Sequence, residues 1–238
     1  MKLDVNDNTQ YKCIYFLAPL YMSLMTCSAV LGAKLINTHF GILSAASLVS
    51  PFWFILGDII TEVYGLKIAM RLFWSVIICQ FLFAFTCYFM IHLHSPSSWP
   101  GQAGYEMVLG QLIRIAAFQF IGVTIAWNIN ARLLSKWKIL MRGKYFWLRS
   151  IGSTGIGLVL FSILSVFPTI VGIHPLNVVI SIVSWSCLLK LVFTILLAGP
   201  STLVVILLKR IEEIDIKKPI VNYNPFTSSE QTNSIKFG

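Results

Sequence analysis

The segment PFWFILGDIITEVYGLK at residues 51–67 decides the class of fold to which this chain belongs. It is apolar except for a few polar side chains, among which Asp58 and Glu62 are carboxylates. Because they are four residues apart, a helix places them on one face, one turn from each other. A carboxylate in hydrocarbon is unfavourable unless it faces a cavity or a partner, so Asp58 is a candidate functional residue. The other interpretation is that Asp58 pairs locally and Glu62 lies in interfacial water.

The composition of the whole chain is that of an integral membrane protein. Of its 238 residues 57% are hydrophobic and 11% are charged, whereas soluble domains carry about 25% charged residues. The net charge of +9 does not indicate a nucleic-acid partner, because the basic residues lie between apolar runs rather than on one soluble face. We also expect the first span to be retained, since residues 1–10 lack the features of a cleavable signal.

The hydrophobic runs predict an all-α fold, a polytopic six-helix transmembrane bundle in residues 1–210 with a polar cytoplasmic tail in residues 211–238. The predicted spans are residues 14–33, 42–60, 72–91, 112–133, 151–173 and 178–208. Lys and Arg residues mark alternate connections, the largest basic loop being 132–149, and this predicts that both termini are cytoplasmic. The sixth span is too long for a straight crossing, so we expect tilt or a break at Gly199–Pro200.

Several polar residues lie at or within the predicted spans. Lys190 is deep in the sixth span, so it should face the bundle and pair with an acid or a ligand. Arg114 begins the fourth span and Lys34 closes the first, and each either snorkels to the headgroups or contacts a substrate. Asn128 could form a hydrogen bond to a neighbouring helix. Ionic groups of opposite sign at membrane depth suit a polar solute that binds there or passes through.

Metal and redox chemistry are not indicated. The cysteines lie in or beside apolar runs without a C-x-x-C pair, which is typical of small buried residues; they are Cys13, Cys27, Cys79, Cys87 and Cys187. His92 and His94, in a loop expected at 92–104, are too few for a metal site. The chain has no nucleophile elbow, no H-E-x-x-H motif and no phosphate-binding loop.

Several motifs together resemble one family, the queuosine precursor transporters (YhhQ type), also called vitamin uptake transporters. The likeness rests on D-x-x-T-E-V-Y-G at 58–65 with Lys67, Arg71 and Trp74, on Ala33-Lys34, on the segment 105–114 ending in Arg114, on R-x-x-G-S-T at 149–154, and on Lys190, Pro200, the basic stop 208–210 and N-P-F at 224–226. The chain departs from the family at Ser28, where Asn is common, and at Leu158 and Phe161, where polar residues are common.

The resemblance implies a transporter, not an enzyme, that imports a 7-deazaguanine such as preQ0, preQ1 or queuine across the inner membrane, without a cofactor or a metal. Expected substrate-binding residues are Asp58, Glu62, Lys190, Arg114, Lys34, Trp53, Tyr64, Ser153, Thr154 and Asn128. In this hypothesis Asp58 or Glu62 accepts two hydrogen bonds from the base, and an aromatic ring stacks on its face. Lys190 pairs with the acid when the site is empty.

Expected partners are a small heterocyclic substrate and the lipid bilayer, with a homo-oligomer or an energising ATPase left open. Three alternatives remain at this stage: a binding subunit of an ATP-driven vitamin uptake complex, an intramembrane enzyme using Asp58 and Glu62, and a structural scaffold.

Overall fold

The fold was analysed in a computed structural model, which describes residues 11–39, 41–96, 98–173 and 175–212. Its elements are α1 (Ile14–Leu31), β1 (Leu35–Thr38), β2 (Gly41–Ser44), α2 (Ala46–Tyr64), α3 (Leu66–Ile91), α4 (Gln102–Leu109), α5 (Leu112–Leu140), α6 (Phe146–Phe161), η1 (Ser162–Val166), α7 (Phe167–Ile170) and α8 (Leu176–Ile211). In the described part of the chain, six helical segments are long and apolar enough to cross a membrane. The predicted all-α bundle is confirmed. The predicted polar tail, with N-P-F at 224–226, lies outside the described residues beyond position 212.

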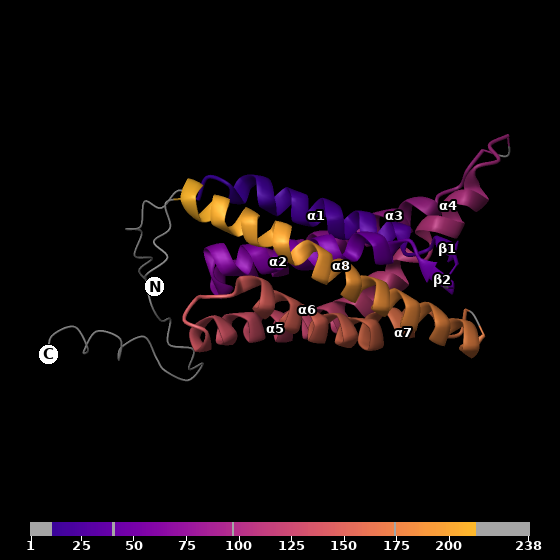
Figure 1. The fold of residues 1–238 in the computed structure, drawn as a ribbon. Helices are drawn as coiled ribbons and strands as arrows, with labels where there is room; N and C mark the ends of the chain where they lie inside the picture. The colour runs from indigo at the N-terminus through magenta and orange to yellow at the C-terminus, as the bar shows by residue number, and fades with distance from the viewer. Residues whose placement is uncertain (1–10, 40, 97, 174, 213–238) are drawn as a thin grey trace, which may run out of the picture.

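The helix α2 lies at the centre of the bundle (Figure 1). It packs against α1, α3, α5 and α8, and every side chain from Trp53 to Tyr64 is buried. A helix that is apolar around most of its circumference is stable only when neighbours cover it on several sides. The fold therefore places Asp58 and Glu62 inside protein rather than against lipid.

A short antiparallel hairpin occupies the start of the predicted span 42–60. Leu35 pairs with Ser44 at its base, and Thr38 Oγ1 donates to the carbonyl oxygen of Gly41 at its tip, over 2.7 Å. Gly41 has φ of 144° and its Cα lies against the Trp185 ring, so a side chain there would be strained and would clash. The hairpin is thereby held against α8 at the end of the bundle opposite the described chain ends (Figure 1).

The fifth crossing is made of α6, the π-helical turn η1 and α7 in succession. Pro168 follows η1 and has no N–H to donate to the preceding turn. A wider π turn is a common way for a helix to absorb such a disturbance. It presents the backbone of residues 164 and 165 to α5.

The helix α5 contacts η1 closely at Gly122. Replacing this glycine with alanine is expected to destabilise the bundle. An added Cβ would lie 2.6 Å from Ser165 Cβ and 2.7 Å from its backbone nitrogen. We expect Gly122→Ala to lower the free energy of unfolding by about 1–3 kcal/mol through overpacking. Thermal unfolding in detergent measures this, with Gly104→Ala in α4 as the control, since nothing lies within 4 Å of that added Cβ. Equal unfolding midpoints for the two variants would contradict the close contact.

The last helix, α8, is continuous through Gly199 and Pro200, so the break considered at this dipeptide is not present. Its 36 residues span about 54 Å at 1.5 Å per residue, well beyond the roughly 30 Å hydrocarbon core. Figure 1 shows the helix crossing the bundle obliquely. The length of α8 is therefore not taken up by a break at Gly199–Pro200, and the helix runs unbroken.

The two ends of the described chain meet beside Glu212. Its carboxylate accepts hydrogen bonds from the backbone nitrogens of Lys12 (3.0 Å) and Cys13 (2.6 Å) and from the Tyr64 hydroxyl (2.8 Å). Burial acts to raise the pKa of the Glu212 carboxyl, but these hydrogen bonds outweigh it and hold the pKa below its ordinary value. The start of the first span and the end of the last span therefore lie at the same end of the bundle.

Candidate functional site

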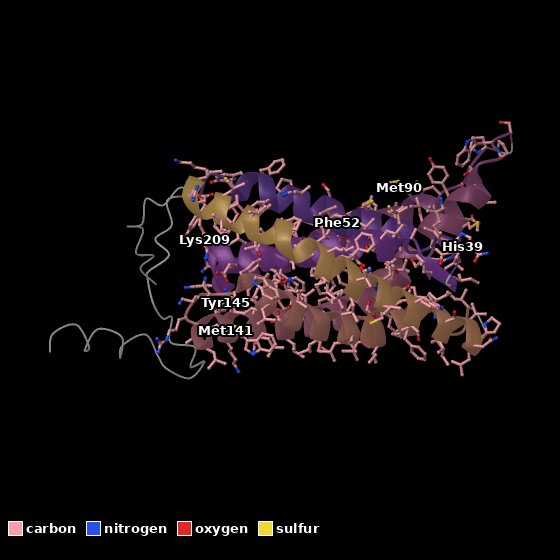
Figure 2. All side chains as sticks on the ribbon, viewed as in Figure 1. His39, Phe52, Met90, Met141, Tyr145 and Lys209 are labelled. Carbon is pink, nitrogen blue, oxygen red and sulfur yellow. The ribbon has the colours of Figure 1, made fainter. Side chains whose placement is uncertain are left out.

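Four charged residues from four helices form a cluster near the end of the bundle that holds both chain ends. Glu62 of α2 pairs with Arg149 of α6 (3.0 Å), Lys209 of α8 (2.8 Å) and Lys138 of α5 (3.2 Å). Figure 2 labels Lys209 at this end, opposite His39. We call these residues the Glu62 cluster. One buried acid facing three cations ties the four helices together at this end of the bundle.

The position of Arg149 corrects the predicted basic loop 132–149. The helix α5 continues to Leu140 and α6 begins at Phe146, so the connection is only five residues long. Arg149 is inside α6 and fully buried, and its Nε donates to the carbonyl oxygen of Lys144 over 3.0 Å. The pairing with Glu62 explains why a basic residue that appeared to belong to a surface loop lies in the core.

One turn from Glu62, Asp58 is held only by uncharged donors. Asn130 Nδ2 donates to Oδ1 over 2.7 Å, while the hydroxyls of Ser150 (2.6 Å) and Thr154 (2.5 Å) donate to Oδ2. All four side chains are at most 2% exposed. We call them the Asp58 cluster. It joins α2, α5 and α6 through one carboxylate.

A cavity lined by both polar and apolar side chains lies in the other half of the bundle, towards the hairpin. It is lined by Ser28, Gly32, Ser44, Ala46, Ser47, Ser50, Gln111, Ile115, Gln119, Phe161, Ser165, Val166, Thr169, Ile170, Ile182 and Lys190. The space open to water-sized molecules is ≈ 60 Å³, enough for a few waters. A flat heterocycle can therefore be enclosed there only if the walls separate.

Among the described residues of this lining, Lys190 is the only charged side chain. It is 2% exposed, and its Nζ lies 4.8 Å from the centroid of the Phe161 ring. Within the described ranges, no carboxylate or carbonyl oxygen lies within bonding distance of this ammonium group. A buried ammonium group beside an aromatic ring suits an uncharged or anionic ligand that supplies an acceptor.

The expected pairing of Lys190 with Asp58 or Glu62 is not what the structure shows. Asp58 is saturated by its three neutral donors, and Glu62 is saturated by Lys138, Arg149 and Lys209. Neither acid is in the cavity lining. Both acids have partners of their own, and Lys190 belongs to a separate polar region.

Two further predicted residues, Thr154 and Ser153, lie on α6 with different roles. Thr154 belongs to the Asp58 cluster. Ser153 is fully buried, but its hydroxyl makes a 3.4 Å contact to the carbonyl oxygen of Ser150 in its own helix. Of the predicted set, the structure thus brings only Thr154 into contact with Asp58.

The predicted aromatic residues lie away from the cavity. Trp53 is stacked on Phe54 and is edge-on to Phe161, which reaches the cavity wall. Tyr64 contacts Glu212 and Tyr11 at the end of the bundle. Phe161, rather than either of these residues, supplies the aromatic surface of the cavity.

Three other predicted residues have local roles. Arg114 donates to the carbonyl oxygens of Pro168 (3.2 Å) and Val171 (2.6 Å), and so caps the end of α7. Lys34 is exposed at the base of the hairpin. Asn128 is half-buried and donates to the carbonyl oxygen of Thr124 in its own helix, so the cross-helix hydrogen bond expected of it is made by Asn130 instead.

Of the positions where the sequence departs from the resembled family, Ser28 and Phe161 line the cavity, whereas Leu158 is a core residue.

Four polar residues of the two regions were not predicted from the sequence: Asn130 and Ser150 of the Asp58 cluster, and Gln111 and Gln119 of the cavity lining. For Asn130 the available signal was its polarity within an apolar span.

One comparison with known proteins gives a match. A family model described as "Putative vitamin uptake transporter" matches residues 44–205, which include α2, the Asp58 cluster, Lys190 and most of α8. Searches of curated proteins and of solved structures return no match.

Proposed function

Because this chain belongs to the vitamin uptake transporter family and has six helical segments able to cross a bilayer, we propose that it imports a queuosine precursor across the inner membrane. The substrate class is a 7-deazaguanine base such as preQ0, preQ1 or queuine. The family is one of transporters. The six long apolar helical segments of this chain make it a multi-pass membrane protein. The identity of the substrate, the membrane and the direction of transport belong to the proposal.

The observation that carries the proposal is the buried ammonium group of Lys190 in a cavity that also has serine and glutamine side chains in its lining. A buried cation without an acidic partner is unfavourable unless a ligand supplies an acceptor. The carbonyl oxygen of a 7-deazaguanine base is such an acceptor, and a bond from an ammonium group is stronger than one between neutral groups. We therefore assign Lys190 to the base carbonyl.

The rest of the cavity suits a flat base with both donors and acceptors on its edges. Ser28, Ser50 and Ser165 present hydroxyl groups, and Gln111 and Gln119 bring amides that can accept as well as donate. The Phe161 ring supplies an apolar face for stacking. In this assignment amide and hydroxyl oxygens accept from the base, the role first expected of Asp58 or Glu62.

The orientation follows from charge. Lys138, Lys144 and Lys209 lie near the end with the Glu62 cluster, and we propose that this end is cytoplasmic, as basic residues near spans indicate. The cavity then lies in the outer half of the membrane, and the Glu62 cluster closes the inner end. In this proposal substrate enters the cavity from the outer side when its walls separate.

The test is restoration of queuosine in a bacterial strain that neither makes its precursors nor imports them. We expect expression of this chain to restore queuosine in tRNA when nanomolar-to-micromolar preQ0 is supplied, whereas an empty vector does not. The readout is the retardation of queuosine-containing tRNA in boronate gels.

Uptake of labelled preQ0 by the purified protein in liposomes without ATP is the companion measurement. Uptake there excludes the alternative of a subunit that depends on an ATP-driven partner. Absence of queuosine in the cells together with absence of uptake by the liposomes refutes the proposed substrate.

A further inference from the structure

Asp58 is a buried carboxylate without a cationic partner. Its oxygens accept from Asn130, Ser150 and Thr154, which are all neutral. Across the part of the chain that the structure describes, no Lys, Arg or His side chain forms an ion pair with it. Carboxylates placed in this way inside membrane bundles are typical of proton and ion pathways.

The same cluster can hold Asp58 in its protonated form. Thr154 Oγ1 also lies 3.4 Å from Asn130 Oδ1, a second acceptor for its hydroxyl hydrogen. When a proton binds to Asp58 Oδ2, the new O–H donates to Thr154 Oγ1, and the Thr154 hydrogen turns to Asn130 Oδ1. No buried hydroxyl then loses its partner, so both forms are satisfied.

The charges around Asp58 also leave both forms accessible. One turn away, Lys138, Arg149 and Lys209 surround Glu62 for a net charge of +2, so the repulsion between the two carboxylates is offset at its source. Burial of Asp58, which is 1% exposed, favours the neutral form. From α1, Tyr21 brings a neutral hydroxyl beside Gly57. From α8, Lys190 lies in the cavity lining, in which Asp58 takes no part.

A short interval of aromatic side chains separates the cavity from Asp58. Phe161 lies in the cavity wall and contacts Trp53 edge-on at 5.7 Å between centroids. Beyond it, Tyr21 Oη and Trp127 Nε1 lie against Gly57, and neither has a hydrogen-bond partner among the described atoms. When these rings separate, their polar atoms can bond to water or to the substrate and so connect the cavity to Asp58.

We propose that Asp58 binds a proton that is carried inward with each substrate molecule. The inference rests on the proposed function and adds the source of energy. A proton from the outer side forms an O–H bond at Oδ2 while the substrate is in the cavity. After the inner end opens, this bond breaks and the proton leaves to the cytoplasmic side with the substrate, which is chemically unchanged.

The experiment uses the full chain in liposomes with labelled preQ0 and an imposed pH gradient, acidic outside. With one proton per neutral substrate molecule, a gradient of one pH unit supports about a tenfold accumulation. We expect the wild type to accumulate preQ0 and to carry protons inward with it, as followed by a pH-sensitive dye inside the liposomes. Asp58→Asn, which keeps the shape but cannot take up the proton, is expected to give no accumulation above the outside concentration.

The control is Glu106→Gln, the same chemical change on exposed α4, where Glu106 contacts Gln102. It is expected to accumulate preQ0 as the wild type does. Accumulation by Asp58→Asn overturns the proposal. If Asp58→Asn does not fold, the wild type alone tests the proposal, because entry of substrate without entry of protons also overturns it.

Exchange of labelled for unlabelled preQ0 at equal pH separates the two claims. Failure of the wild type to exchange refutes the proposed substrate. Exchange at equal pH, together with net preQ0 accumulation that does not respond to an imposed pH gradient, refutes only the proton site.

Discussion

Replacing Lys190 with methionine is expected to reduce preQ0 uptake about 10- to 100-fold, because the one cation that the structure describes in the cavity lining is lost. A hydrogen bond to a charged group is worth about 1.5–3 kcal/mol, which corresponds to this range. Methionine has a similar length and is apolar, so it fills the same space. The measurement is the initial rate of uptake into liposomes at low preQ0 concentration.

The stability of Lys190→Met distinguishes loss of binding from loss of fold. Removing a buried ammonium group that has no acidic partner is expected to leave the unfolding midpoint unchanged or to raise it. Lys136→Met, on an exposed part of α5, is the matched control and is expected to transport at the wild-type rate. Wild-type uptake by Lys190→Met would show that substrate does not contact this residue.

Replacing Glu62 with glutamine is expected to cause the largest loss of stability. The change leaves Arg149, which is fully buried, and two lysines facing one another without a counter-charge. Breaking a buried ion pair by removing one partner typically lowers stability by about 3–5 kcal/mol. In detergent the unfolding midpoint should fall on the order of 10 °C.

A second substitution tests the electrostatic cause of this loss. Glu62→Gln combined with Arg149→Met removes an uncompensated buried charge and should recover part of the stability. Glu106→Gln on exposed α4 is the control for the Glu-to-Gln change itself. If Glu62→Gln unfolds like the wild type, the Glu62 cluster does not hold the four helices together.

The sequence was sufficient for the bundle and for the location of its unusual charges. Long apolar runs have few stable solutions in a bilayer, and Lys190 was too deep in its span to reach water. Asp58 was expected to face either a cavity or a partner, and the structure shows partners.

The partners themselves could not be predicted. Asn128 and Asn130 are both polar residues in an apolar span, and they point about 160° apart on a helix. Because that span carries apolar residues on all sides, its pattern does not indicate which face is inward. Arg149 was hidden for a similar reason, since a basic residue before a span is ordinarily a surface residue. The hairpin at 35–44 is too short for its alternation to stand out from the apolar run that follows.

The contact between Glu212 and the backbone of Lys12 and Cys13, just before α1, determines what a topology experiment will find. The described part of the chain begins and finishes at one end of the bundle. A reporter enzyme fused at Tyr11 and another fused at Glu212 would therefore work in the same compartment, whichever way the protein inserts. A sandwich fusion in the hairpin would report the other compartment.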